Sequence, residues 1–143
     1  NIVILGILRA SLPMQMGFLK GFRKADAAFL SAYRKNTIEN DFEIITEYDA
    51  VPSLKGKTVI IADPMCATGS SLLACYNKLT SNNQPFKVIF ASIFASKEGI
   101  EILSTELPHI VHYTCVVDPE LNAKKYIIPG LGDAGDLAFG EKL

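Results

Sequence analysis

The stretch Thr58-Val-Ile-Ile-Ala-Asp63-Pro-Met-Cys-Ala-Thr68-Gly69-Ser70-Ser71 joins a short apolar run, a single acid and a loop of small residues. A helical pattern of apolar side chains then runs from Ser71 to Leu79. The order strand, loop, helix predicts that residues 63–71 form a loop at the carboxyl edge of a sheet. The first amides of the helix, which have no partner within it, would point into that loop.

The polar groups of the 63–71 loop favour a phosphate as its ligand. Backbone N–H groups and the positive end of a helix attract anions. Thr68 and Ser71 add hydroxyl donors, and Gly69 lets the backbone approach closely. Asp63 is well placed for sugar hydroxyls or a bound Mg²⁺, which favours a ribose phosphate. An ordinary strand-to-helix turn with a Ser or Thr cap is the alternative.

Two commoner phosphate motifs are excluded. A P-loop needs a Lys near its end, and no Lys occurs between Lys57 and Lys78. The sequence Gly130-Leu-Gly132-Asp-Ala-Gly135 matches the glycine spacing of a dinucleotide site. It lies too close to the end of the sequence for the helix and second strand that such a site requires.

Composition indicates one globular domain over residues 1–143, with 49% apolar and 20% charged residues. The net charge of −1 provides no electrostatic footprint for nucleic acid, and the first apolar run is too short to span a membrane. Three cysteines without a CxxC pair indicate reduced thiols and a cytoplasmic protein. Cys66 is interpreted as a small apolar filler rather than a catalytic thiol.

Apolar runs alternate with helical patterns along the chain. Strands are predicted at residues 2–8, 27–34, 42–48, 58–62, 87–94 and 111–117, and helices at 13–24, 71–79 and 97–107. The first helix should carry Met14, Phe18, Leu19 and Phe22 on one face, and residues 35–41 form a polar loop. This alternation predicts an α/β fold with a doubly wound, mostly parallel sheet.

Four segments resemble the phosphoribosyltransferases, and specifically the uracil phosphoribosyltransferase family. The 63–71 loop resembles the family's loop for 5-phosphoribosyl-1-diphosphate (PRPP). Ile7-Leu-Arg9-Ala and Ser31-Ala-Tyr-Arg34 resemble its two diphosphate-contacting segments. Tyr126-Ile-Ile-Pro-Gly-Leu-Gly-Asp-Ala-Gly-Asp136 resembles its uracil-binding segment and is the most specific match.

The resemblance implies a type I phosphoribosyltransferase fold and the transfer of phosphoribose from PRPP to uracil, giving UMP and diphosphate in pyrimidine salvage. Arg9, Asp63 and Asp133 would be catalytic. Uracil would contact Ile127, Gly132, Asp133 and Ala134, largely through backbone groups. PRPP would contact Arg9, Arg34, Asp63, Pro64, Met65, Cys66, Ala67, Thr68, Gly69, Ser70, Ser71 and Asp133.

The resemblance also implies Mg²⁺ as cofactor, carried by PRPP without directly assigned protein ligands, and a homo-oligomer. It implies a strained or cis peptide in residues 8–11. It further implies an N-terminal helical region before the first strand in full-length members, so this sequence is expected to be a fragment or a natural truncation. Neither a nucleic acid nor a membrane is expected as a partner.

The sequence departs from the family pattern where Ser11 and Ser70 replace Gly, Cys66 replaces Leu, and Leu137 replaces a basic residue. Ser11 would reach the backbone conformations of a Gly less easily. A non-catalytic or regulatory nucleotide-binding protein on the same fold is therefore the alternative function. Transfer to a purine base is a second one, and the 126–136 segment argues against it.

Overall fold

The computed structural model describes residues 1–36, 42–45 and 48–141, without the side chains of residues 33–36, 42–45 and 82. The helices are α1 (Leu12–Gly21), α2 (Ser70–Asn82), α3 (Lys97–Glu106) and α4 (Ala134–Phe139). The strands are β1 (Ile2–Leu8), β2 (Asp26–Ser31), β3 (Tyr33–Asn36), β4 (Phe42–Ile45), β5 (Asp49–Ala50), β6 (Thr58–Ala62), β7 (Met65–Cys66), β8 (Lys87–Ser96), β9 (Val111–Asp118), β10 (Glu120–Leu121) and β11 (Ile127–Ile128).

The main sheet has the order β5-β2-β1-β6-β8, and β8 also pairs with β9 and β7. All of these pairs are parallel except β2 with β5. The chain moves outward from β1 to β2 and then returns to the other side of β1 with β6. The strand order therefore reverses between β1 and β6, where a ligand site is expected in such a sheet. The predicted doubly wound, mostly parallel sheet is confirmed.

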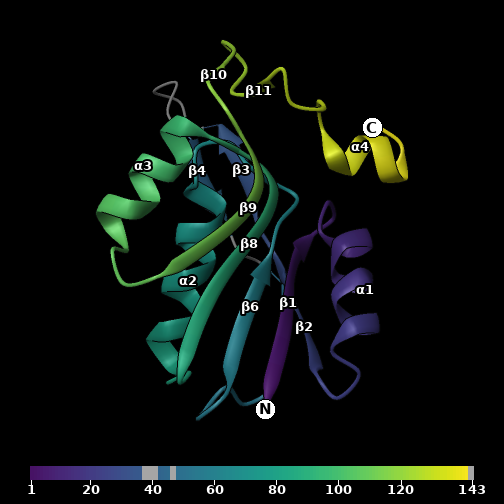
Figure 1. Cartoon of the computed structure of the whole chain (residues 1–143), viewed down its shortest axis with the longest axis vertical. Coiled ribbons are helices and arrows are strands. Elements are labelled where there is room, and N and C mark those ends of the chain that lie inside the picture. Colours follow the sequence, from purple (N-terminus) through teal and green to yellow (C-terminus); the bar gives the residue numbers. More distant parts are fainter. Residues whose placement is uncertain (37–41, 46–47, 142–143) are drawn as a thin grey trace.

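Helices cover both faces of this sheet, with α1 on one face and α2 and α3 on the other (Figure 1). Alternate residues of β1 enter the two cores, since Leu5 packs on the α2 side and Ile4 on the α1 side. A strand buried on both faces needs an unbroken apolar sequence. This explains why β1 and β6 are almost entirely apolar and why their predicted bounds are confirmed.

Helix α1 is shorter than predicted and begins one residue earlier, at Leu12. Met14, Phe18 and Leu19 pack on the sheet as expected. The prediction for Phe22 is wrong, because this side chain follows the end of the helix, is exposed and stacks on Phe18 instead.

A buried Gln15 fixes α1 to the sheet. Its side-chain amide donates to the carbonyl oxygens of Ile4 at 3.0 Å and Ala28 at 2.9 Å. Gly6 makes room for it, since a Cβ at Gly6 would lie 2.9 Å from Oε1 of Gln15 and 2.6 Å from Oγ of Ser11. These contacts position the loop of residues 8–11, which joins β1 to α1.

The predicted strand at 27–34 is wrong in its second half. The main-sheet strand β2 ends at Ser31, and Tyr33 starts a separate antiparallel pair of β3 with β4. The predicted strand at 42–48 is described only as β4, and the middle of the predicted polar loop, residues 37–41, lies outside the described residues.

The C-terminal segment lies above the carboxyl ends of the strands (Figure 1). Strands β10 and β11 form a small antiparallel pair, and α4 follows next to the loop that leaves β1. Within the described ranges, no helix has the length and apolar character needed to cross a membrane.

Candidate functional site

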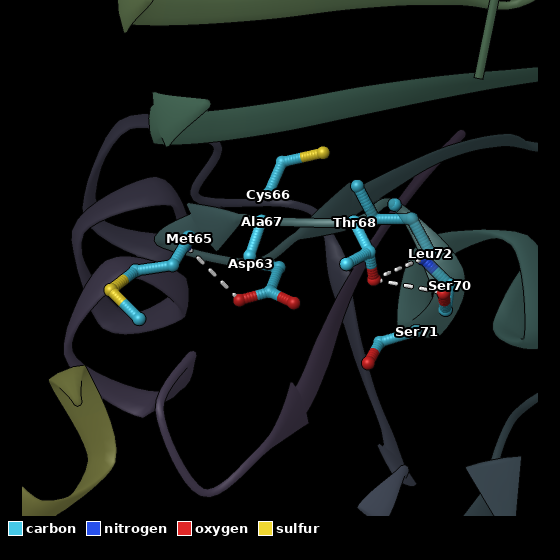
Figure 2. Close-up of a pocket in the computed structure, with 9 residues that line it drawn as sticks. Asp63, Met65, Cys66, Ala67, Thr68, Ser70, Ser71 and Leu72 are labelled. Carbon is cyan, nitrogen blue, oxygen red and sulfur yellow. Dashed lines mark hydrogen bonds between the residues drawn. The ribbon is translucent and has the colours of Figure 1, made fainter. Parts of the chain in front are cut away.

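The 63–71 loop surrounds a small cavity at the carboxyl end of β6. Its lining comprises Asp63, Met65, Cys66, Ala67, Thr68, Gly69, Ser70, Ser71 and Leu72 (Figure 2). The polar side chains of Asp63 and Ser71 point to one side of the loop in this view, whereas the Cys66 side chain points to the other. The predicted phosphate loop is thus a concave surface with hydroxyl groups, a carboxylate and the start of a helix.

The start of α2 has a glycine as its N-cap. Gly69, with φ of 74°, offers no side chain for capping, but the Thr68 hydroxyl accepts a long hydrogen bond from the Ser70 N–H at 3.4 Å. The nearby hydroxyls of Thr68 and Ser70 bond to each other at 2.8 Å. The structure thus contains a Thr contact of the kind that the capped-turn alternative expects, and it does not separate this alternative from a phosphate loop. The first amides of α2 border the cavity, where they can serve an anion.

The start of helix α3 contacts the backbone of the 63–71 loop. Ser96, the N-cap of α3, accepts from the Gly99 N–H at 2.9 Å, and its hydroxyl donates to the Ala67 carbonyl. A Cβ at Gly99 would lie 2.5 Å from that same carbonyl oxygen. Neither residue was predicted from the sequence to belong to the site. Their signal was a Ser three positions before a Gly at a helix start, which is too common to indicate a site.

Asp63 is a buried carboxylate, 9% exposed. It accepts one hydrogen bond from the Met65 N–H at 3.2 Å. No cation pairs with it among the residues whose side chains are described. Burial raises the pKa of Asp63 from 3.8 to about 7, and the Met65 bond opposes this rise only in part. Such a group would gain from a ligand hydroxyl or a cation in the cavity.

Cys66 is buried, and burial together with the negative charge of Asp63 raises the pKa of its thiol to about 12. A thiol that stays protonated at neutral pH is a poor nucleophile. This supports the interpretation of Cys66 as an apolar filler that belongs to the loop through its backbone.

The loop of residues 8–11 contains a cis peptide between Leu8 and Arg9, so this prediction is confirmed. Ser11 has φ of −73° and ψ of −19°, an ordinary helical conformation. The concern that Ser reaches the required backbone less easily than Gly is therefore unfounded here. The Ser11 hydroxyl is buried and has no partner among the described residues.

Arg9 leaves the same edge of the sheet as Asp63, because β1 and β6 are neighbouring parallel strands. Its guanidinium is directed to the C-terminal segment. Nη2 donates to Asp136 Oδ1 at 2.8 Å and to the Gly140 carbonyl at 3.2 Å. Arg9 does not line the cavity of the 63–71 loop. The loops share one edge as predicted, but the cation is held by an acid that the sequence analysis did not select.

Arg34 lies in β3, outside the main sheet. Its side chain is not among those described, so its contact with diphosphate stays a prediction.

The 126–136 segment contains the short strand β11, a tight loop at residues 129–133 and the start of α4. Gly130 and Gly132 have φ of 47° and 89°, and the peptide between Ile128 and Pro129 is cis. Ile127 is buried, and the Gly130 N–H donates to the Asp118 carboxylate at 3.0 Å. A Cβ at Gly132 would meet no heavy atom within 4 Å. The backbone at Gly132 therefore borders open space, which a base could fill.

Asp133 has a structural task that the sequence analysis did not foresee. It is the N-cap of α4, and its carboxylate accepts from the Asp136 N–H at 2.9 Å. This bond fixes the turn that joins Gly132 to Ala134. The predicted role of Asp133 near the reacting centre stays a prediction.

Comparison with known proteins decides the family. The family profile described as uracil phosphoribosyltransferase matches residues 1–141. The chain belongs to the uracil phosphoribosyltransferase family. A uracil phosphoribosyltransferase of Porphyromonas gingivalis is 43% identical over 144 residues, with 100% of this chain and 67% of that relative covered. One from Thermococcus gammatolerans is 41% identical, with 100% and 63% covered.

Solved structures agree with the fold. A solved structure of a protein from Aquifex aeolicus matches with a TM-score of 0.87 at 36% identity. The match covers 97% of this chain and 65% of the Aquifex chain. A hypoxanthine phosphoribosyltransferase of Staphylococcus aureus has a TM-score of 0.65 at 18% identity, covering 85% and 64%. The latter likeness supports the type I phosphoribosyltransferase fold alone. The chain spans 60 to 67% of the length of the curated uracil phosphoribosyltransferases that it matches.

Proposed function

We propose that this member of the uracil phosphoribosyltransferase family transfers phosphoribose from PRPP to uracil, producing UMP and diphosphate. The observation that carries the proposal is the position of two unlike sites at one sheet edge. The cavity of the 63–71 loop, which is suited to an anion, follows β6. The glycine-rich 126–136 segment, which is suited to a flat base, lies next to the loop that follows the neighbouring strand β1. Family membership supplies the reaction.

In this proposal the bond from sugar C1 to the diphosphate oxygen breaks, the bond from C1 to uracil N1 forms, and the N1 proton passes to solvent water. C1 gains oxocarbenium character as diphosphate leaves. Arg9 and Arg34 stabilise the charge on the leaving group. The 5′-phosphate is held by residues 67–71, and this remote binding energy positions C1 against N1. Asp63 accepts hydrogen bonds from the ribose hydroxyls.

We propose that Mg²⁺ arrives with PRPP. The described residues contain no group of three or more acidic, His or Cys side chains that could hold a metal. Asp63 is a buried carboxylate at the cavity with no cation partner among the described side chains, which fits a shared ion better than a resident one. When bound, Mg²⁺ neutralises charge on the diphosphate.

Selectivity for uracil would come from backbone donors and acceptors at Ile127, Gly132 and Ala134. Uracil presents an acceptor, donor, acceptor edge, and cytosine reverses this order at N3 and C4. Fixed peptide groups would then face cytosine donor to donor and acceptor to acceptor. Unpaired buried polar groups can discriminate by roughly 10⁴-fold.

Competition of uracil, 5-fluorouracil, cytosine and hypoxanthine for PRPP tests the proposal. Uracil and 5-fluorouracil should be used, because fluorine leaves the hydrogen-bonding edge unchanged. Efficient use of cytosine or hypoxanthine would refute the assignment of the 126–136 segment. Binding of PRPP or UMP without turnover would favour the non-catalytic alternative.

The expected homo-oligomer and cytoplasmic location stay predictions. Light scattering after size exclusion would test the first of them. Nucleic acid and membranes remain unexpected as partners.

A further inference from the structure

We infer that Asp136 is a positioning residue that holds Arg9 for the diphosphate and ties the diphosphate loop to the uracil segment. This inference rests on the proposed function. It starts from the ion pair between residues 127 positions apart in sequence, at 2.8 Å. Both side chains are about one third exposed, so the pair lies where a ligand can still reach it.

The geometry leaves part of the guanidinium available. The hydrogen bonds of Arg9 to Asp136 and to Gly140 both use the single nitrogen Nη2. Nε is buried without a partner among the described residues. A guanidinium has five N–H donors, so the two of Nη1 remain for phosphate oxygens while Nη2 anchors the group. Asp136 therefore orients the Arg9 guanidinium and leaves the Nη1 donors for a ligand.

The same contact joins the two substrate segments. Asp136 lies in α4, whose first turn is fixed by the Asp133 cap. Helix α4 lies next to the 8–11 loop, since a Cβ at Gly135 would lie 3.8 Å from the Ala10 nitrogen, an ordinary contact distance. A helix of six residues does not persist in water unaided. Order in the uracil segment and the placement of Arg9 should therefore depend on each other.

The test is Asp136→Asn, which keeps the shape and removes the charge. We expect the KM for PRPP to rise and kcat to fall, each by about tenfold, with the KM for uracil within about twofold of its original value. Inhibition by inorganic diphosphate should weaken by a similar factor. Asp26→Asn is the matched control, because it breaks an ion pair of 2.7 Å with Lys57 at the opposite end of the strands. This control should leave all of these constants unchanged.

A double-mutant cycle separates positioning from mere stability of α4. If Asp136 acts through Arg9, Asp136→Asn should cause no further loss in an Arg9→Gln background. Additive losses would overturn the inference. Tighter binding of PRPP or diphosphate by Asp136→Asn would also overturn it, since Asp136 would then be a competitor for Arg9.

Equilibrium binding of diphosphate with Mg²⁺ keeps this test independent of turnover. Absence of turnover in the unmodified protein would refute the proposed function alone. Equal diphosphate affinity in the unmodified protein and in Asp136→Asn would refute the inference alone.

Discussion

The buried carboxylate of Asp63 should lower the stability of the ligand-free protein at neutral and alkaline pH. Burial raises its pKa from 3.8 to about 7, and no cation among the described side chains offsets that burial. A tenfold change in proton affinity corresponds to about 1.4 kcal/mol, so ionised Asp63 costs up to about 4 kcal/mol in the folded state. Asp63→Asn removes the charge and retains an oxygen for the Met65 N–H.

The sign of the pH dependence follows from the direction of the shift. The folded state holds the proton more tightly than the unfolded state, so the contribution of Asp63 to stability is fully present below pH 3.8. It is lost as the pH rises through about 7. The free energy of unfolding of Asp63→Asn should therefore exceed that of the unmodified protein by about 2–4 kcal/mol at pH 8. This difference should shrink steadily toward pH 5.

Urea unfolding at pH 5, 6, 7 and 8 in phosphate-free buffer measures this difference. Asp49→Asn is the control, because Asp49 is an exposed acid paired with Lys78 at 3.0 Å. Its removal should change stability by less than about 1 kcal/mol at every pH. A pH-independent difference for Asp63→Asn, or a less stable variant at pH 8, would refute the reasoning. The same variant should handle ribose poorly, which would explain why the costly acid is retained.

Two further substitutions test the neighbouring parts of the site. Arg9→Ala should lower kcat by roughly 10²–10³ with a smaller effect on the KM for uracil, because Arg9 acts on the charge of the leaving group; unchanged turnover in steady-state assays would favour the non-catalytic alternative. Gly99→Ala should destabilise the protein and raise the KM for PRPP, because the new Cβ would lie 2.5 Å from the Ala67 carbonyl. Gly17 lies in a helix, and a Cβ there would meet open space, so Gly17→Ala should instead raise the free energy of unfolding in urea by about 1 kcal/mol. Equal effects at the two sites would contradict the packing argument.

The sheet and the position of the 63–71 loop between β6 and α2 could be predicted because their signals are local. A short, unbroken apolar run such as Ile2–Leu8 favours a strand covered on both faces, and its bounds are confirmed. Thr68 and Gly69 between a strand and a helix likewise predict an anion site from spacing alone. The ends of α1 and β2 were predicted less well, because Ala32 turns the chain from the main sheet into a hairpin without a Gly or Pro to indicate it.

The sequence by itself determined which backbone segments form the two sites, since strand, loop and helix depend on residues close together along the chain. Only the tertiary structure decided how the segments support one another. Asp136 meets Arg9 across 127 positions, and Ser96 holds the Ala67 carbonyl from another helix. The burial of Asp63 also depends on this packing, because desolvation reflects every neighbour in space. No local pattern records such neighbours, so the energy of the site could be derived only from the folded chain.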